Sequence, residues 1–212
     1  MGNFVKDHFG DYKSYQEEIK RLDYEALLES NQGLQIGSPY FLQFDMTPCP
    51  FEGDLVNAKV VLLLANPGVN GDDIREINHN LPIEGWGIKN LSLEIPSNWY
   101  RKRFKTLLDE ENGRSWQWLS NNVAMIQIVP WASKKWRNVK LPSRQLMAET
   151  VQRLIEVNPN VLIVVMRQKN YWLNVIGPYP KIIINKRPIC SYITQGNFGD
   201  DWFTIKNQLH FS

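Results

Sequence analysis

Four short runs of apolar residues occur along the chain after its first fifty positions. They cover 60–65, 123–129, 161–166 and 181–184, and each is continuous and rich in β-branched residues. Runs without polar alternation are typical of strands that are buried on both faces of a parallel sheet. The pattern therefore predicts four central, mainly parallel strands, with 191–194 as the alternative position of the fourth.

Segments with helical spacing of apolar residues precede and separate these runs. Residues 11–30, 101–111, 141–158 and 200–211 have this spacing, and the third segment begins with Pro142-Ser143 and ends just before Pro159. Alternating strands and helices predict an α/β fold, here a three-layer α/β/α sandwich around a four-stranded sheet. We expect a single domain over 1–212, with an N-terminal helical extension over about 1–50.

Composition narrows the classes of protein that this chain belongs to. With 212 residues, 43% of them hydrophobic and eight tryptophans, the chain is long and apolar enough to bury a core. No apolar run reaches the roughly 18 residues of a membrane span, and the first residues lack a secretion signal, so we expect a cytoplasmic protein with no membrane partner. Two cysteines and three scattered histidines predict no metal site, and nothing in the sequence indicates a cofactor.

The first apolar run ends abruptly in Asn66-Pro67-Gly68. These are common turn residues, so a simple strand-ending turn is one interpretation. Ligands of open parallel sheets bind beyond the carboxyl ends of the strands, so the other interpretation is a platform that holds the Asn66 amide in a cleft. Neither GxxxxGK[ST] nor GxGxxG follows the run, which disfavours a P-loop NTPase and a dinucleotide-binding enzyme.

Cations and aromatic residues gather after the second run. The segment 130–140, "PWASKKWRNVK", interleaves two tryptophans with four cations. This mixture suits a nucleic-acid surface, on which Lys134, Lys135 and Arg137 would contact phosphates, or a solvated loop whose tryptophans are anchored in the core. A net charge of only +2 requires any nucleic-acid affinity to come from such a local patch. Arg167, directly after the third run, is either a polar stop or a further phosphate contact.

Two other segments have the same double interpretation. "HNLPIEGWGIKN", residues 79–90, is a loop or a pocket wall that presents Trp86 as a stacking face. "TQGNFGDD", residues 194–201, is a glycine-rich helix cap or a place where the backbone around Asn197 closely approaches a ligand.

The run "NAKVVLLLANPGVN" resembles the first motif of the uracil-DNA glycosylase superfamily, especially its mismatch-specific uracil/thymine branch. In that branch a strand ends in Gly-Ile-Asn-Pro-Gly, and the asparagine holds the hydrolytic water; here Leu64-Ala65 precede Asn-Pro-Gly, so the leading glycine is missing. "NNVAMIQIVPW" is similar to the second strand of the superfamily, which commonly ends in a polar residue a little before the base pocket. "VLIVVM" matches the third strand.

The last motif of the superfamily, a His-Pro-Ser or Asn-Pro-Ser loop, is absent from this chain. "TQGNFG" stands in its place and makes Asn197 the expected counterpart of the base-contacting residue, while "NKRPICS", residues 185–191, is the second candidate for that loop. The resemblance covers roughly 55–211 in strand order, and Asn-Pro-Gly is its sharpest match.

The resemblance implies a DNA glycosylase, which flips a damaged or modified pyrimidine out of DNA and hydrolyses its N-glycosidic bond to leave an abasic site. A hypermodified pyrimidine of phage DNA is one candidate substrate. Such chemistry needs a positioned water, donors for the departing base and an aromatic wall for the flipped base. The implied catalytic residues are Asn66 and Asn197. The implied base pocket consists of Pro67, Gly68, Trp86, Trp131, Gln195 and Gly196. The implied DNA contacts are Lys134, Lys135, Arg137 and Arg167.

Two other functions stay open at this point. The missing histidine-containing loop leaves room for a non-catalytic nucleic-acid-binding module on the same scaffold. A small-molecule nucleotide hydrolase with a similar sheet edge is the third possibility, and it would bind mononucleotides but not DNA. For the glycosylase and for the binding module, DNA is the expected partner and a monomer is the expected state.

Overall fold

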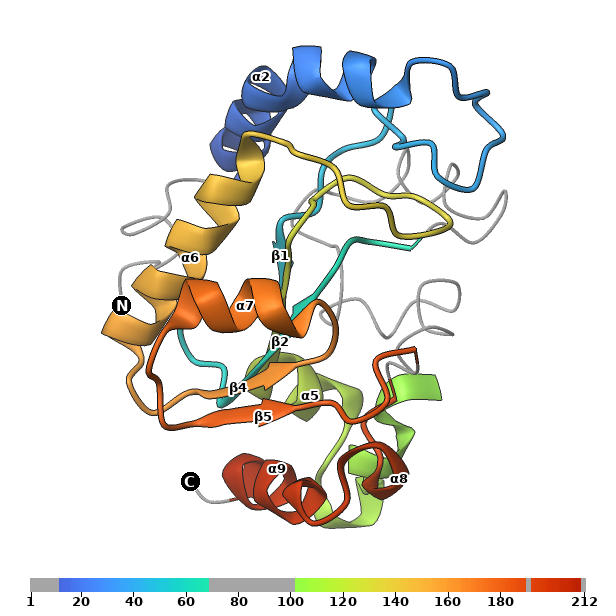
Figure 1. The fold of residues 1–212 in the computed structure, drawn as a ribbon. Helices are drawn as coiled ribbons and strands as arrows, with labels where there is room; N and C mark the ends of the chain where they lie inside the picture. Colours follow the sequence, from blue (N-terminus) through green and yellow to red (C-terminus); the bar gives the residue numbers. More distant parts are fainter. Residues whose placement is uncertain (1–11, 69–101, 190–191, 211–212) are drawn as a thin grey trace.

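Residues 12–68, 102–189 and 192–210 are the parts of the chain that this computed structural model describes (Figure 1). Their centre is a five-stranded sheet with the order β1-β3-β2-β4-β5. The strands are β1 (Phe51–Glu52), β2 (Val60–Leu64), β3 (Val123–Gln127), β4 (Leu162–Val165) and β5 (Ile182–Ile184). The last four run parallel, as predicted, and only the two-residue β1 pairs antiparallel, with β3. The predicted α/β class is confirmed, with one short edge strand added.

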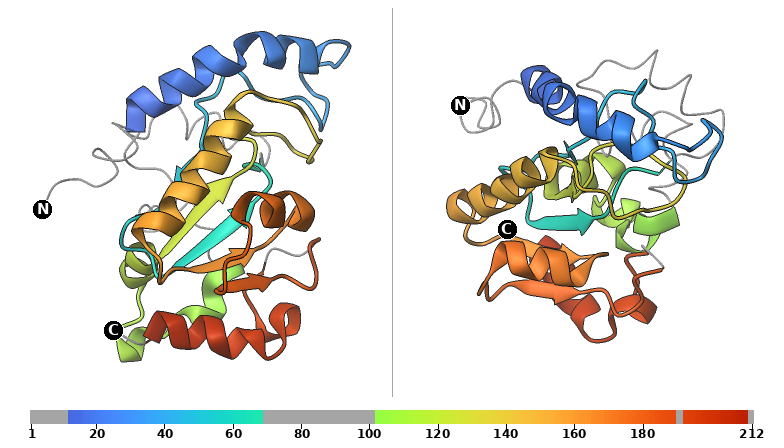
Figure 2. Two further views of the ribbon diagram at one scale, coloured as in Figure 1. Left: turned by 60° about the vertical axis from the view of Figure 1, so that its left-hand side comes forward. Right: turned by 45° about the horizontal axis from the view of Figure 1, so that its top comes forward.

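Both faces of the sheet are covered, which is why its strands read as unbroken apolar runs. The side chains of Val61 and Leu63 enter one core, and those of Val60, Leu62 and Leu64 enter the other. Figure 2 shows the three layers. The first core lies under α2 (Tyr12–Asn31), α6 (Ser143–Val157) and α7 (Lys169–Ile176). The second core lies under α5 (Trp116–Asn122), α8 (Gln195–Phe198) and α9 (Asp201–His210).

Three of the four predicted helices are present with almost the predicted bounds, as α2, α6 and α9. The continuous helix predicted over 101–111 is wrong. The chain makes one helical turn at 102–104 and then two 3-10 turns, η3 (Lys105–Leu107) and η4 (Glu110–Asn112). Leu108 between them is extended, and the Asp109 carboxylate accepts from the backbone and side-chain amides of Asn112. Such a local side-chain bond competes with helical hydrogen bonds.

Helices α5 and α7 were not predicted. Ser115 caps α5, because its hydroxyl accepts from the Trp118 backbone N–H. α7 starts at Gln168, which adopts a left-handed conformation with φ 55° that a non-glycine residue rarely takes. Neither start resembles the Pro-Ser pattern that marks α6.

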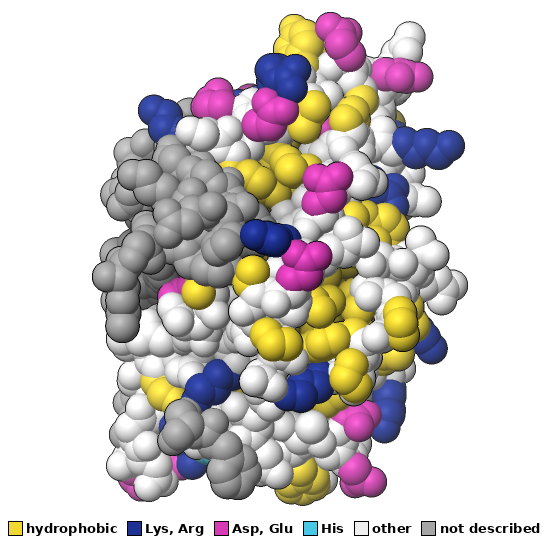
Figure 3. Space-filling view, turned by 90° about the vertical axis from the view of Figure 1, so that its left-hand side faces the viewer, with side chains coloured by type: hydrophobic (Ala, Val, Ile, Leu, Met, Phe, Trp, Pro, Cys, Tyr) yellow, Lys and Arg dark blue, Asp and Glu magenta, His cyan; other side chains and the backbone are white. Residues whose placement is uncertain are grey.

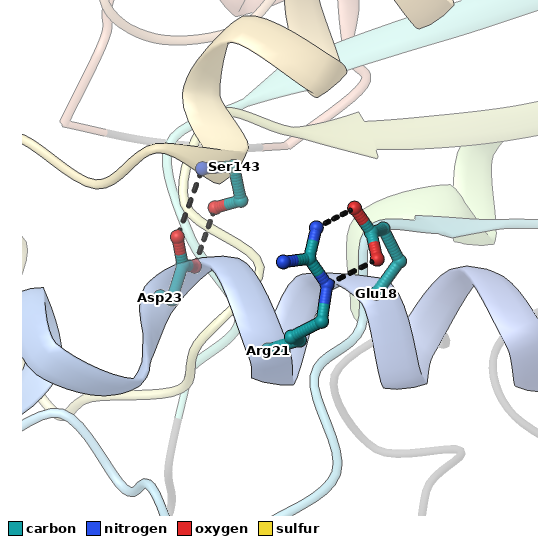
Figure 4. Close-up of polar contacts among 4 residues, drawn as sticks. All are labelled: Glu18, Arg21, Asp23 and Ser143. Carbon is teal, nitrogen blue, oxygen red and sulfur yellow. Dashed lines mark hydrogen bonds and ion pairs between the residues drawn. The ribbon is translucent and has the colours of Figure 1, made fainter.

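A buried carboxylate joins the N-terminal helix to the rest of the molecule. Asp23 of α2 is fully buried, and it accepts from the Ser143 backbone N–H at 2.8 Å and the Ser143 hydroxyl at 2.5 Å (Figure 4). It also accepts from the indole N–H of Trp131. Burial raises the pKa of Asp23, and the three donors oppose that rise. The neighbouring Arg21–Glu18 pair, in contrast, lies on the solvent side of α2.

The surface mixes charges of both signs. On the face drawn in Figure 3, the coloured Lys and Arg side chains alternate with Asp and Glu. This mixture agrees with a net charge of only +2. A cationic surface for a polyanion must therefore be local. No helix among the described residues is long and apolar enough to cross a membrane.

Candidate functional site

The order of the strands puts the topological switch point of the sheet, where a crevice is expected, at the carboxyl ends of β2 and β4. The chain continues from β2 to β3 on one side, by way of α5, and from β4 to β5 on the other side, by way of α7. α5 and α7 cover opposite faces of the sheet, so the two connections separate above the adjacent strand ends. Ligands of open α/β sheets bind at such a point. Asn66 follows β2 there, and Arg167 follows β4.

The carboxamide of Asn66 is held in one orientation. Its Nδ2 donates to Ser133 Oγ and to the carbonyl oxygen of Pro67, each at 2.9 Å. Ser133 Oγ in turn donates to the carbonyl oxygen of Lys135 at 2.9 Å, so its lone pair faces Asn66. An amide nitrogen has two protons, and both are used. Among the described residues no donor reaches Oδ1 of this half-buried side chain, which leaves Oδ1 as a fixed, open acceptor.

The backbone around Asn66 continues the sheet and forms no turn. Leu64 and Ala65 accept from the N–H groups of Ile128 and Val129, which follow β3. Beyond them Ser133 N–H donates to Pro67 O at 3.2 Å, and Gly68 forms an isolated parallel bridge with Ser133. The segments after β2 and β3 therefore run side by side past the ends of both strands. As far as Gly68, where the described part ends, the chain therefore follows its neighbour and makes no turn.

A tryptophan of α7 fixes the same strand end from the other side. Trp172 is fully buried, and its indole N–H donates to the carbonyl oxygen of Leu64 at 3.1 Å. That oxygen also accepts from Ile128 N–H. Leu64 lies two residues before Asn66, so the base of the candidate site is held from both neighbouring elements.

Gln127, the last residue of β3, is a second amide at this edge that the sequence did not reveal as a site residue. It pairs with Leu64 in the sheet and is only 3% exposed, yet its Oε1 has no hydrogen-bond partner in the described structure. Leaving such a group unpaired costs about 1–3 kcal/mol, and among the described residues Gln16 Oε1 in α2 is a second such oxygen. Strand geometry puts its Cα roughly 8 Å from that of Asn66. The sequence signal was a lone glutamine in an apolar run.

The asparagines expected in the last motif form hydrogen bonds with backbone groups close to them in the sequence. Asn197 is 6% exposed, and its Nδ2 donates to the Tyr192 carbonyl at 2.7 Å. In the alternative loop, the Asn185 side chain accepts from Arg187 N–H and donates to Arg187 O. No hydrogen bond among the described residues joins either amide to Asn66. Gln195 and Gly196 begin α8 and are exposed.

Of the two tryptophans expected to stack on a base, the structure describes only Trp131. Trp131 is 2% exposed and packs in the first core, where its indole N–H donates to Asp23 at 2.7 Å. The little of Trp131 that is not covered lines a hollow against α2, so the ring packs against the N-terminal helix and does not fit the expected role of a base-pocket wall. Trp86 lies outside the described residues.

The four cations expected to contact DNA fall into two groups: two exposed lysines, and two arginines that donate hydrogen bonds to backbone carbonyls. Lys134 and Lys135 are exposed and form no ion pair with any described residue. Arg137 is half-buried and donates to the Ser30 carbonyl at 2.6 Å, which ties the loop to the end of α2. Arg167 donates to the Ile189 carbonyl at 3.2 Å. It lines a hollow of about 630 Å³ at the ends of β4 and β5, together with Lys169 and Lys186.

Comparison with family models, with curated proteins and with solved structures finds no match to this chain. Within the described ranges, no group of three or more His, Cys, Asp or Glu side chains is arranged to hold a metal ion.

Proposed function

We propose that this chain is a DNA N-glycosylase. It flips a damaged or modified pyrimidine out of DNA and hydrolyses the N-glycosidic bond to leave an abasic site. The observation that carries the proposal is the orientation of Asn66, whose two N–H donors are engaged by Ser133 and Pro67 and whose Oδ1 stays open. An acceptor fixed at the carboxyl end of a central strand is suited to hold one water molecule.

The proposed reaction uses that water as the nucleophile. The water donates one hydrogen to Asn66 Oδ1, and its lone pair points toward C1′ of the flipped nucleotide. The bond from C1′ to the base breaks, its electron pair leaves with the base, and the sugar passes through an oxocarbenium-like state. Water oxygen then bonds to C1′ and releases a proton to solvent. Because an amide is a weak base, Asn66 orients the water and does not deprotonate it.

Gln127 supplies base recognition in this proposal. Its buried carboxamide offers one acceptor and two donors, which match the mixed donors and acceptors on the Watson–Crick edge of a pyrimidine. Lys134, Lys135 and Arg167 contact phosphates. We further propose that the protein acts as a monomer in the cytoplasm and uses no cofactor.

A non-catalytic nucleic-acid-binding module on the same scaffold is the second candidate. The observation in its favour is the side chain of Asn197, which donates to the Tyr192 carbonyl of its own loop instead of facing Asn66. This module would bind nucleic acid through the same edge of the sheet and release no base.

Single-turnover formation of abasic sites separates the two candidates. The protein is incubated with uracil-containing, mismatched and phage DNA, and abasic sites are then cleaved with alkali. We expect cleavage of at least one substrate, abolished by Asn66→Ala and retained by Asn207→Ala, which removes an exposed amide from α9. Binding without cleavage on every substrate would favour the module. Base release from mononucleotides alone would indicate a nucleotide hydrolase.

A further inference from the structure

The loop between α2 and β1 exposes three large apolar side chains, two of them aromatic. Ile36, Tyr40 and Phe44 are 64%, 41% and 46% exposed, whereas Phe41 and Leu42 between them are 6% and 2% exposed. Large apolar side chains gathered in one short surface segment indicate an interaction surface. We call residues 36–44 the aromatic segment.

The backbone of the aromatic segment is anchored at several points, so the Cα atoms that carry its exposed rings are held in place. The Asn31 side chain donates to Leu42 O at 2.8 Å and accepts from Leu42 N–H at 3.0 Å. Gln43 N–H donates to Ala132 O at 2.9 Å, and Lys135 N–H donates to Pro39 O at 2.7 Å. A segment whose backbone is already fixed loses less conformational entropy when a partner stacks on its rings.

Cations accompany these rings. The ammonium of Lys135 lies 5.9 Å from the centroid of the Tyr40 ring, and Lys134 precedes it in the exposed turn. The two segments that meet here, 32–48 and 130–141, carry one acid, Asp45. Their cations are Lys134, Lys135, Arg137 and Lys140. Exposed aromatic faces next to unpaired cations match the bases and phosphates of an unpaired nucleic-acid strand.

This surface connects directly to the candidate site. Ser133 Oγ donates to the carbonyl oxygen of Lys135, and Ser133 Oγ also accepts from Asn66 Nδ2. A strand lying over Tyr40 and Lys135 therefore leads toward the crevice. On its other side Phe44 lines a hollow of about 160 Å³ against α2, whose remaining lining is mainly apolar, with Lys20 as its one charged residue.

We propose that Tyr40 and Phe44 form a stacking platform for unpaired nucleotides, with Lys134 and Lys135 on the phosphates. This inference rests on the proposed function in that it takes DNA as the ligand, and it adds that the bound DNA is single-stranded next to the target base. Bases inside a duplex keep their faces stacked on each other, so a duplex cannot use this platform.

Equilibrium binding of a fluorescent single-stranded oligonucleotide, and of the same sequence as a duplex, tests the platform. The protein carries Asn66→Ala, so that no turnover occurs during titration. Replacing Tyr40 and Phe44 together by leucine keeps apolar volume and removes the ring faces. We expect about 25-fold weaker single-strand binding, roughly fivefold for each stacked base, and duplex binding changed by less than about twofold.

Matched variants keep the result specific. Phe203→Leu changes an equally exposed ring on α9, 51% exposed, and should leave both affinities unchanged. The exchange Tyr40→Phe with Phe44→Tyr retains both ring faces and should keep single-strand affinity. A leucine variant that binds single strands as tightly as the parent overturns the platform, as does a parent protein that binds duplex and single strand equally.

Different experimental outcomes refute the stacking platform and the proposed glycosylase activity. A protein that forms no abasic sites but loses single-strand affinity in the leucine variant keeps the platform and refutes the glycosylase. Abasic sites formed equally well by the parent and the leucine variant, on both single-stranded and duplex substrates, refute the platform and keep the glycosylase.

Discussion

The segments that follow β2 and β5, the second of which includes α8, both contain asparagine side chains, but they hold them in different ways. Asn66 is oriented by a serine from the neighbouring segment and keeps Oδ1 open. Asn197 and Asn185 donate to carbonyls of their own loop, Tyr192 O and Arg187 O. A carboxamide that ties its own loop stabilises the fold. One that another element orients, with an acceptor left over, can also bind a ligand.

Replacing each amide by alanine gives the largest expected effect and the most direct way to break this comparison. Asn66→Ala should slow base release on the order of 10²-fold or more, because the water loses its orientation, and should lower stability by no more than about 1 kcal/mol. Asn197→Ala should do the reverse: base release should stay close to the parent rate, and the protein should lose about 1 kcal/mol of stability with the part-buried hydrogen bond to the Tyr192 carbonyl. Single-turnover rates and denaturant melts measure both quantities.

Two results would contradict this assignment. An Asn66→Ala protein that is strongly destabilised but turns over normally would make Asn66 a structural residue. An Asn197→Ala protein that is stable but inactive would move the catalytic role to the loop after β5.

Gln127 extends the comparison to a buried amide with no partner. Gln127→Leu should weaken binding of the target base about tenfold or more, since one or two hydrogen bonds of about 1 kcal/mol are lost. Folding stability should stay equal or rise, because the unpaired polar atom is removed from the interior. Gln16→Leu is the control: Gln16 is equally buried and its Oε1 also lacks a partner, but its Nε2 donates to Pro48 O, so the loss of that bond should destabilise the protein. A destabilised Gln127→Leu protein with unchanged affinity would end the recognition role.

The strands could be predicted because strands buried on both faces tolerate almost no polar residue, and only such strands read as unbroken apolar runs. β1, with two residues, leaves no comparable pattern. The position of Asn66 at the carboxyl end of β2 could be predicted, since a strand's end is local information, and its catalytic role stays a proposal. The roles of Ser133 and Gln127 could not, because they follow from lateral partners; Ser133 meets an amide 67 positions away.

Trp131 shows the same limit. A tryptophan among cations is typical both of a stacking surface and of a core anchor, and the local sequence does not distinguish them. Trp131 is a core anchor because its indole N–H donates to the buried carboxylate of Asp23, which lies 108 positions away in the sequence. The role of a residue that depends on a partner far away in the sequence cannot be predicted from the local pattern.

Ser133 allows the orientation of Asn66 to be tested without removing the amide. Ser133→Ala deletes one of the two acceptors that hold Nδ2, so the carboxamide gains rotational freedom. We expect base release to slow about fivefold, the equivalent of about 1 kcal/mol, at unchanged DNA affinity. Ser133→Thr keeps the hydroxyl and should restore the rate. In the Asn66→Ala background Ser133→Ala should have almost no further effect on the rate, whereas additive losses would show that Ser133 acts independently of Asn66.

The cations after β3 give the smallest expected effect and test whether exposure separates binding residues from structural ones. Lys134→Ala with Lys135→Ala removes two exposed charges that pair with no described residue. The log–log salt slope of duplex binding should fall by about 1.8, or about 1.4 for a single strand, at unchanged stability. Arg137→Ala should leave the slope nearly unchanged and lower the free energy of unfolding, because the guanidinium donates to Ser30 O at the end of α2. Titrations at four or five salt concentrations, together with a thermal melt, measure both effects. If Arg137→Ala lowers the slope as much as the lysine changes do, its bond to α2 does not remove it from the binding surface, and half-burial is no guide to function in this loop.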